Sequence, residues 1–179
     1  MAAERDDLQD QVLRGIGRNV LNLQKMEGML KFILSSTGKI GSTNDMTQPG
    51  KNLEQSIKSR TKTINRLPMG RLAEALSQVL RTEQEGQQKT ASDSDRFSID
   101  VSFSIEDEDF TNDLSQALGE IVGERNNLIH KRLIRFDPNS IESCRDLIKE
   151  LDEQRARIKP QFEALSAICL SLKESFQQL

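Results

Sequence analysis

The residues with the clearest capacity for chemistry lie between Glu124 and Arg135. This segment holds four cations (Arg125, Lys131, Arg132 and Arg135) against one acid, together with the only histidine of the chain, His130. Cleavage of RNA by its own 2′-hydroxyl requires a proton acceptor, a proton donor and a cation at the phosphate. A histidine, which titrates near neutral pH, meets these needs beside an arginine without a metal. The segment therefore suits metal-independent cleavage of RNA.

The same residues admit plainer interpretations. A single histidine on a helix is more often structural or merely exposed than catalytic. The cations at Lys131, Arg132 and Arg135 also suit a solvated face near a helix C-terminus, where the helix dipole favours positive charge. Composition alone leaves both interpretations open.

A long helix is predicted to carry this segment, from about residue 109 to residue 136, and the acids at its start suit the positive end of a helix dipole. At about 100° per residue, Arg125 lies at the centre of the apolar stripe and His130 lies about 140° away. His130 shares its side with Gly119 and Gly123 and with Asn126 and Ile134. The angle implies either a distorted helix near Gly123 or a site assembled from two copies of the chain.

An arginine within an apolar stripe requires an acid, because an unpaired buried charge costs several kcal/mol. Glu27 lies in the apolar stripe of the first predicted helix. Glu27 is therefore the predicted partner of Arg125, and the pair could be purely structural.

The run Arg125-Asn126-Asn-Leu-Ile-His130 resembles the R-x4–6-H motif of the HEPN superfamily, including the polar residue after the arginine. The context is similar too, because the motif lies late in a helix-rich chain with one more long helix behind it. The stretches GRNVLNLQKMEGMLKFIL and RNNLIHKRLIRFDPNSIESCRDLIKELDEQRARI resemble a group of uncharacterised bacterial HEPN-like proteins. The resemblance leaves the middle of the chain unmatched.

That resemblance implies a homodimeric helical bundle in which two copies of the motif face each other across an interface cleft. Active members of the family are metal-independent endoribonucleases, often toxins or antiviral effectors held in check by an inhibitory antitoxin or regulatory protein. By position, Arg125 would stabilise the phosphate, His130 would transfer protons and Asn126 would orient the reacting groups. The resemblance implies no cofactor and no metal. Other members have lost activity and serve as binding or scaffold domains.

The composition predicts a single, mainly α domain over residues 1–179, and the resemblance implies that this domain is HEPN-like. Aromatic residues make up only 4% of the chain, charged residues 30%, and Trp and Tyr are absent, which fits a helical bundle and fits a β-sandwich poorly. The net charge of −3 gives no global attraction to RNA. Contact with RNA is therefore expected from a local patch, namely Lys131, Arg132 and Arg135.

The targeting features favour a cytoplasmic protein without a membrane segment. Acids occupy the start of the sequence, where a signal peptide needs basic and apolar residues, and no apolar run approaches ~18 residues. Cys144 and Cys169 form no CxxC pair, and a single histidine leaves too few ligands for structural zinc. We expect both cysteines to be buried, reduced thiols.

The remaining pattern predicts three helices, a polar loop and one strand. A first helix spans about residues 7–34; after a loop over residues 35–52, two shorter helices are separated by Pro68. A polar, flexible loop covers about residues 82–96. Alternating apolar residues over 97–105 predict a short β-strand, paired with a neighbouring chain in a dimer, or an extended arm on the bundle.

The last predicted helix spans Ser140 to near Gln178 as one long, kinked helix that continues through Pro160. Its apolar positions follow steps of three and four, a heptad seam. The seam comprises Ile141, Cys144, Ile148, Leu151, Arg155, Ile158, Phe162, Leu165, Cys169, Leu172 and Phe176.

Three function classes remain open: an RNA-cleaving dimer, a catalytically silent module that binds RNA or a nucleotide, and a helical interaction protein. The first is favoured, because a scaffold has no need for its only histidine beside a basic cluster. Neither a P-loop nor a glycine-rich dinucleotide turn is present in the sequence.

Overall fold

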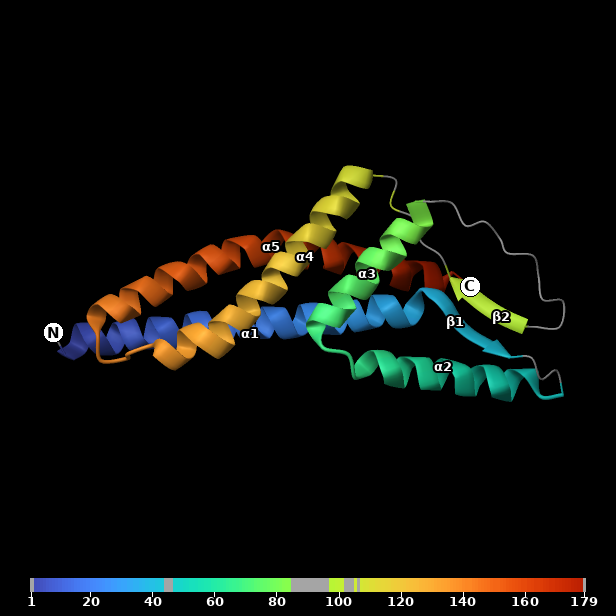
Figure 1. Cartoon of the computed structure of the whole chain (residues 1–179), viewed down its shortest axis with the longest axis horizontal. Helices are drawn as coiled ribbons and strands as arrows, with labels where there is room; N and C mark the ends of the chain where they lie inside the picture. The colour runs from blue at the N-terminus through green and yellow to red at the C-terminus, as the bar shows by residue number, and fades with distance from the viewer. Residues whose placement is uncertain (1, 44–46, 85–96, 102–104, 106, 179) are drawn as a thin grey trace.

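A computed structural model describes residues 2–43, 47–84, 97–101, 105 and 107–178 of the chain. The described residues form a mainly α bundle, as predicted (Figure 1). In chain order the elements are α1 (Ala2–Ser36), β1 (Gly38–Thr43), α2 (Pro49–Asn65), α3 (Met69–Gln84), β2 (Phe97–Val101), α4 (Glu108–Asn127), η1 (Leu128–Arg132), η2 (Leu133–Arg135) and α5 (Ile141–Gln177).

Helices α1 and α5 run side by side in the same direction and form the long axis of the molecule (Figure 1). Their contacts follow the same order along both helices, which shows that the two helices are parallel. The contacting pairs are Glu4–Arg145, Asn19–Leu151 and Met29–Cys169. Helix α5 continues through Pro160, so the prediction of one long C-terminal helix is confirmed. Helix α4 crosses this pair obliquely, which brings its C-terminal end to the region where α5 begins (Figure 1).

The apolar core has two parts. The larger part lies between the second half of α1, α3, α4 and the second half of α5. The smaller part lies between the beginning of α1, the η1–η2 turns and the beginning of α5, and comprises Val12, Leu128, Cys144, Leu147 and Leu151. Each part contains one of the two free, buried cysteines, which confirms the prediction for both thiols.

The buried face of α5 departs from the predicted heptad seam at two kinds of position. Leu147 and Gln154 are buried although the seam omits them, whereas Arg155 lies on the seam and is exposed. The reason is that α5 packs against elements on two sides, α1 along most of its length and α4–η1 near its beginning. The buried face of α5 is therefore wider than the seam of a two-helix coiled coil.

A two-stranded antiparallel sheet is the main correction to the predicted fold. The segment predicted as a loop, residues 35–52, contains β1, which pairs with β2 from Gly38 opposite Val101 to Thr43 opposite Phe97. The predicted strand therefore finds its partner within the chain rather than in a neighbouring copy. It also ends earlier than predicted, at Val101, and residues 102–104 lie outside the described residues.

Two glycines allow β1 to follow α1 and to pack on α2. Gly38 has a φ of 70°, a left-handed conformation that favours glycine directly after a helix end. A Cβ at Gly41 would lie 2.7 Å from Cδ1 of Leu53 on α2, so only glycine permits this close approach. The predicted shorter helices correspond to α2 and α3. Of the predicted polar loop, residues 85–96 lie outside the described residues.

Candidate functional site

The segment that carries His130 is a π-helical turn, η1, inserted at the end of α4. Helix α4 begins where the Asp107 side chain accepts a 2.9 Å hydrogen bond from the backbone N–H of Phe110. At its other end, Leu128 and Leu133 both pack in the smaller core, five residues apart. A backbone hydrogen bond from the N–H of Leu133 to the carbonyl of Leu128 closes that spacing. The π turn therefore allows both leucines to face the core.

A distorted helix near Gly123 was one of the two arrangements that the sequence left open, and this turn is a distortion at a different position. It covers Leu128–Arg132 instead of lying near Gly123, because the spacing of the core leucines, and not the glycine, sets it. In a π turn each residue advances by less than the ~100° of an α-helix. His130 therefore lies closer in angle to Arg125 than a uniform helix would place it.

Arg125 and Asn126 form a side-chain pair one turn before His130. Nη1 of Arg125 donates to Oδ1 of Asn126 at 3.3 Å. Arg125 is half-buried and Asn126 is exposed. Among the described residues, Arg125 has no acidic partner. A half-buried guanidinium without a carboxylate retains N–H groups for an anionic ligand.

The predicted pairing of Glu27 with Arg125 is wrong. Glu27 accepts a 2.6 Å bond from Nζ of Lys31, one turn further along α1. The neighbouring Met26 and Leu30 occupy the core-facing side of α1 and are fully buried. Glu27 therefore lies on the half-exposed flank of the helix, where a lysine four residues away satisfies its charge.

The cations around His130 divide into two groups. His130, Lys131 and Arg135 are exposed, and none of their side chains has a hydrogen bond or an ion pair with another described residue. Arg132 instead turns toward α5, where its Nε donates to Glu150 at 2.7 Å. The structure thus leaves Lys131 and Arg135, but not Arg132, free beside the histidine.

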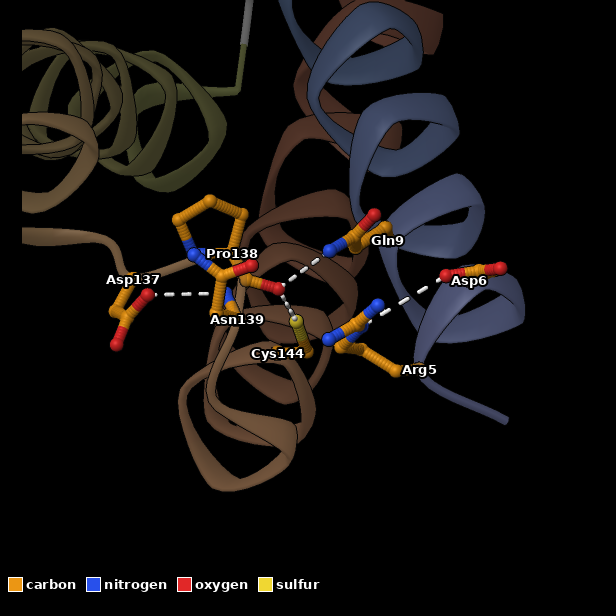
Figure 2. A network of polar contacts seen from close by, with 7 residues as sticks. All are labelled: Arg5, Asp6, Gln9, Asp137, Pro138, Asn139 and Cys144. Atoms are coloured by element: carbon orange, nitrogen blue, oxygen red, sulfur yellow. Dashed lines mark hydrogen bonds and ion pairs between the residues drawn. The ribbon is translucent and has the colours of Figure 1, made fainter. Parts of the chain in front are cut away.

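The turn after η2 is fixed to the N-terminal part of α1 (Figure 2). The backbone carbonyl of Pro138 accepts a 2.6 Å hydrogen bond from Nε2 of Gln9 and a weaker contact from the thiol of Cys144 at 3.6 Å. The Asp137 side chain accepts from the backbone N–H of Asn139 at 2.9 Å, which closes the turn locally. The chain beyond His130 is therefore anchored, so the position of η1 is held from both sides.

One side of α4 and its extension remains uncovered in the single chain. Gly119, Gly123, Asn126, His130 and Ile134 are all exposed there, as the predicted helix wheel placed them together. A Cβ added at either glycine would meet nothing within 4 Å, and Ile134 is 75% exposed. This side, which we call the glycine face, has room for another chain to approach closely.

Sequence reasoning did not predict a cleft between α4, η1 and α5. Two ion pairs cross it: Arg132 with Glu150, and Arg157 with Glu124. Gln154 also lines the cleft, although it is buried. Because Gln154 lies off the predicted seam, the sequence pattern gives no signal for this cleft.

The chain matches none of the protein-family models, curated proteins or solved structures with which it was compared. Within the described residues, no helix combines the length and the apolar character needed to cross a membrane. The described residues also hold no group of three or more His, Cys, Asp or Glu side chains arranged to bind a metal ion.

Proposed function

We propose that this chain is a metal-independent endoribonuclease, in which Arg125, Asn126 and His130 act on RNA. One observation carries the proposal: the π turn presents the only histidine of the chain, exposed and unpaired among the described residues, just beyond a half-buried arginine that lacks an acidic partner. Single π turns within helices occur frequently at functional sites. The exposed Lys131 and Arg135 add positive charge for the RNA backbone.

The reaction is an attack of the 2′-hydroxyl oxygen on the adjacent phosphorus. The bond from phosphorus to the 2′-oxygen forms, the bond to the 5′-oxygen breaks, and a 2′,3′-cyclic phosphate and a 5′-hydroxyl result. His130 in its neutral form accepts the proton of the 2′-hydroxyl. The guanidinium of Arg125 stabilises the charge that develops on the phosphate oxygens, and Asn126 holds that guanidinium in place through its hydrogen bond.

The 5′-oxygen requires a proton as it leaves, and a single chain has one histidine to serve as base. A second copy of the chain supplies a second histidine as the acid. The glycine face offers the surface for this homodimer, because it carries His130 and is open to close approach. The proposed enzyme is therefore a homodimer with a shared site.

The experiment that tests the function is incubation of the purified protein with mixed RNA in EDTA, followed by analysis of the fragment ends. We expect fragments that end in a 2′,3′-cyclic phosphate, and no cleavage of DNA, which lacks the 2′-hydroxyl. Cleavage that stops in EDTA, or equal cleavage of DNA, would contradict the proposal.

A second candidate is a catalytically silent module that binds RNA. The observation that favours it is that His130 has no hydrogen-bond partner among the described residues to orient its ring, whereas catalytic histidines are usually oriented through their second nitrogen. RNA that is bound but never cut would support this candidate.

The resemblance to the HEPN superfamily extends the proposal to the setting of the enzyme. We infer a cytoplasmic toxin or antiviral effector, restrained by an inhibitory antitoxin or a regulatory protein. Co-purification of the chain with a second protein that suppresses its RNA cleavage would test this inference.

A further inference from the structure

The cleft between α4, η1 and α5 has a mixed polar and apolar lining and room for a small group. Its volume is about 180 Å³, below the roughly 300–1,000 Å³ of pockets for drug-sized ligands, so it suits a single small ring system rather than a larger molecule. Leu128 and Leu151 contribute apolar surface, and polar side chains form the remaining wall. The lining residues are Glu124, Asn127, Leu128, Arg132, Glu150, Leu151, Glu153, Gln154 and Arg157.

The charge of the cleft argues against a phosphate ligand. Three glutamates line it, and both of its arginines are already paired, Arg132 with Glu150 and Arg157 with Glu124. The lining therefore carries an excess of negative charge. A free phosphate would be repelled, whereas an uncharged ligand would not.

Gln154 provides a hydrogen-bond donor whose orientation is fixed by the core. Asn19 is fully buried, and its Nδ2 donates to the backbone carbonyl of Leu151 at 2.8 Å. Because a carbonyl can only accept, this contact fixes the orientation of the Asn19 amide. The same Nδ2 donates to Oε1 of Gln154 at 3.0 Å, which fixes the second amide in turn.

The amino group of Gln154 is consequently the branch that faces away from Asn19. Gln154 is only 6% exposed and lines the cleft, and its Nε2 has no acceptor among the described residues. Nε2 is not one of the solvent-shielded atoms without a partner, so it is open to the cleft, where an acceptor of a ligand can bind it in place of water.

Glutamates of the same helix, α5, also line the cleft, and their carboxylates can accept hydrogen bonds. Glu153 is exposed and has no partner among the described residues, and Glu150 has one oxygen engaged by Arg132. Oε2 of Glu124 is also without a donor, but it is shielded from solvent. Glu150 and Glu153 are therefore the carboxylates that a ligand reaches first.

We propose that this cleft binds a nucleobase of the RNA substrate and that it prefers guanine. The ligand must be uncharged, present an acceptor to Gln154, present N–H donors to carboxylates and cover apolar surface. Guanine has the O6 and N7 acceptors and, beside each other, the N1–H and N2 donors that suit a carboxylate, whereas adenine places the N1 acceptor beside its amino group, which a carboxylate repels. The identification of the base as part of RNA rests on the proposed nuclease function.

The position of the cleft connects it to the candidate site. Leu128 and Arg132, which line the cleft, belong to the same π turn as His130. Leu128 and Arg132 are each two residues from His130 in the chain, and the polar residues proposed to bind the base belong to α5. A base held in the cleft would select which phosphate of the RNA reaches His130.

Titration of the isotope-labelled full chain with guanosine, adenosine and inorganic phosphate, followed by NMR, tests the proposal. Guanosine should shift the side-chain amide signals of Asn127 and Gln154 saturably and more strongly than adenosine, and phosphate should leave both unchanged. Glu153→Gln should weaken guanosine binding by about tenfold or more, because a charge-assisted hydrogen bond is lost. Glu142→Gln, which alters an exposed glutamate of α5 outside the cleft, is the matched control and should bind as the wild type does.

Gln154→Met serves as a second variant, with its fold checked by circular dichroism, and should also weaken guanosine binding. Unchanged amide signals, phosphate binding tighter than guanosine binding, or equal loss in Glu142→Gln would overturn the base site. Guanosine binding without any RNA cleavage would retain the base site and reject the nuclease. RNA cleavage with no guanosine binding, and with cut positions unchanged in Glu153→Gln, would reject the base site alone.

Discussion

Gly15 of α1 faces Leu151 of α5 so closely that a Cβ at position 15 would lie 3.1 Å from Cδ1 of the leucine. One turn later, Asn19 binds the backbone carbonyl of the same Leu151 at 2.8 Å. These two contacts set the close packing of the two long helices beside the smaller core. The cleft and the π turn both depend on that packing, because Leu151 also lines the cleft and packs with Leu128.

A matched pair of glycine substitutions tests this packing. Gly17 is exposed, and a Cβ added there would meet nothing within 4 Å, so Gly17→Ala should raise the free energy of unfolding by about 0.5–1 kcal/mol through helix propensity. Gly15→Ala gains the same propensity but crowds Leu151, and overpacking typically costs about 1–3 kcal/mol. Chemical denaturation should therefore show Gly15→Ala to be the less stable variant. Equal stability of the two would contradict the close packing.

Dimerisation through the glycine face gives a second prediction. In the single chain, Gly123 is exposed and has room for a side chain, so Gly123→Leu should not lower the stability of the monomer. In a dimer that packs closely on this face, the leucine should prevent the approach and shift sedimentation toward the monomer. Gly17→Leu is the control and should leave the assembly unchanged. A wild-type monomer at micromolar concentration would remove the shared site from the account.

The thiol of Cys169 gives a third prediction, through its pH dependence. Burial raises the pKa of this thiol, and the nearby Lys173 opposes the rise. The folded state therefore holds the proton more tightly than the unfolded state. Its contribution to stability is present below the ordinary thiol pKa of about 8.5 and is lost as the pH rises through the folded-state value. Lys173→Met should raise the pKa further and slow alkylation of Cys169 at pH 8 to 9, measured by mass spectrometry; faster alkylation would contradict this.

The helices were predictable because their apolar residues recur at spacings of three and four residues. Helix α4 also carries acids at its start, which is typical of a helix N-terminus. Strand β1 was not predictable from the sequence, because Gly38–Thr43 has two glycines and no alternation of apolar and polar residues. Its pairing with β2 depends on a partner distant in the chain and on the close approach of Gly41 to α2. Such non-local contacts leave no periodic signal in the strand itself.

The candidate site was predictable in composition but not in geometry. The angle between Arg125 and His130 left open a distorted helix or a site assembled from two copies. The position of the observed distortion follows from Leu128 and Leu133, whose spacing matters only once the smaller core is known. The Glu27 pairing failed because the helix wheel put Glu27 at the centre of the stripe, whereas Met26 and Leu30 define the core-facing side. The cleft depends on two amides, Asn19 and Gln154, that meet only in the folded chain.

Replacement of Arg125 gives a fourth prediction, on RNA cleavage. Arg125→Lys keeps the positive charge but loses the planar set of donors that binds both Asn126 and a phosphate. Removal of one such stabilising donor set typically costs about 10²–10³ in rate, and we expect a loss of that order. Arg135→Lys, on an exposed residue without a partner among the described residues, should change the rate little. Equal effects of the two substitutions would indicate a general role of positive charge rather than a specific contact.

The measurement that tests the central claim most directly is the RNA cleavage rate of His130→Ala against the wild type, in EDTA. Because His130 is exposed and packs in neither part of the core, the variant should fold as the wild type does, which circular dichroism verifies. Loss of general acid–base help should lower the rate by at least about 10²–10⁴, and Lys131→Ala, one residue away, should lower it far less. Cleavage by folded His130→Ala at the wild-type rate would contradict the account.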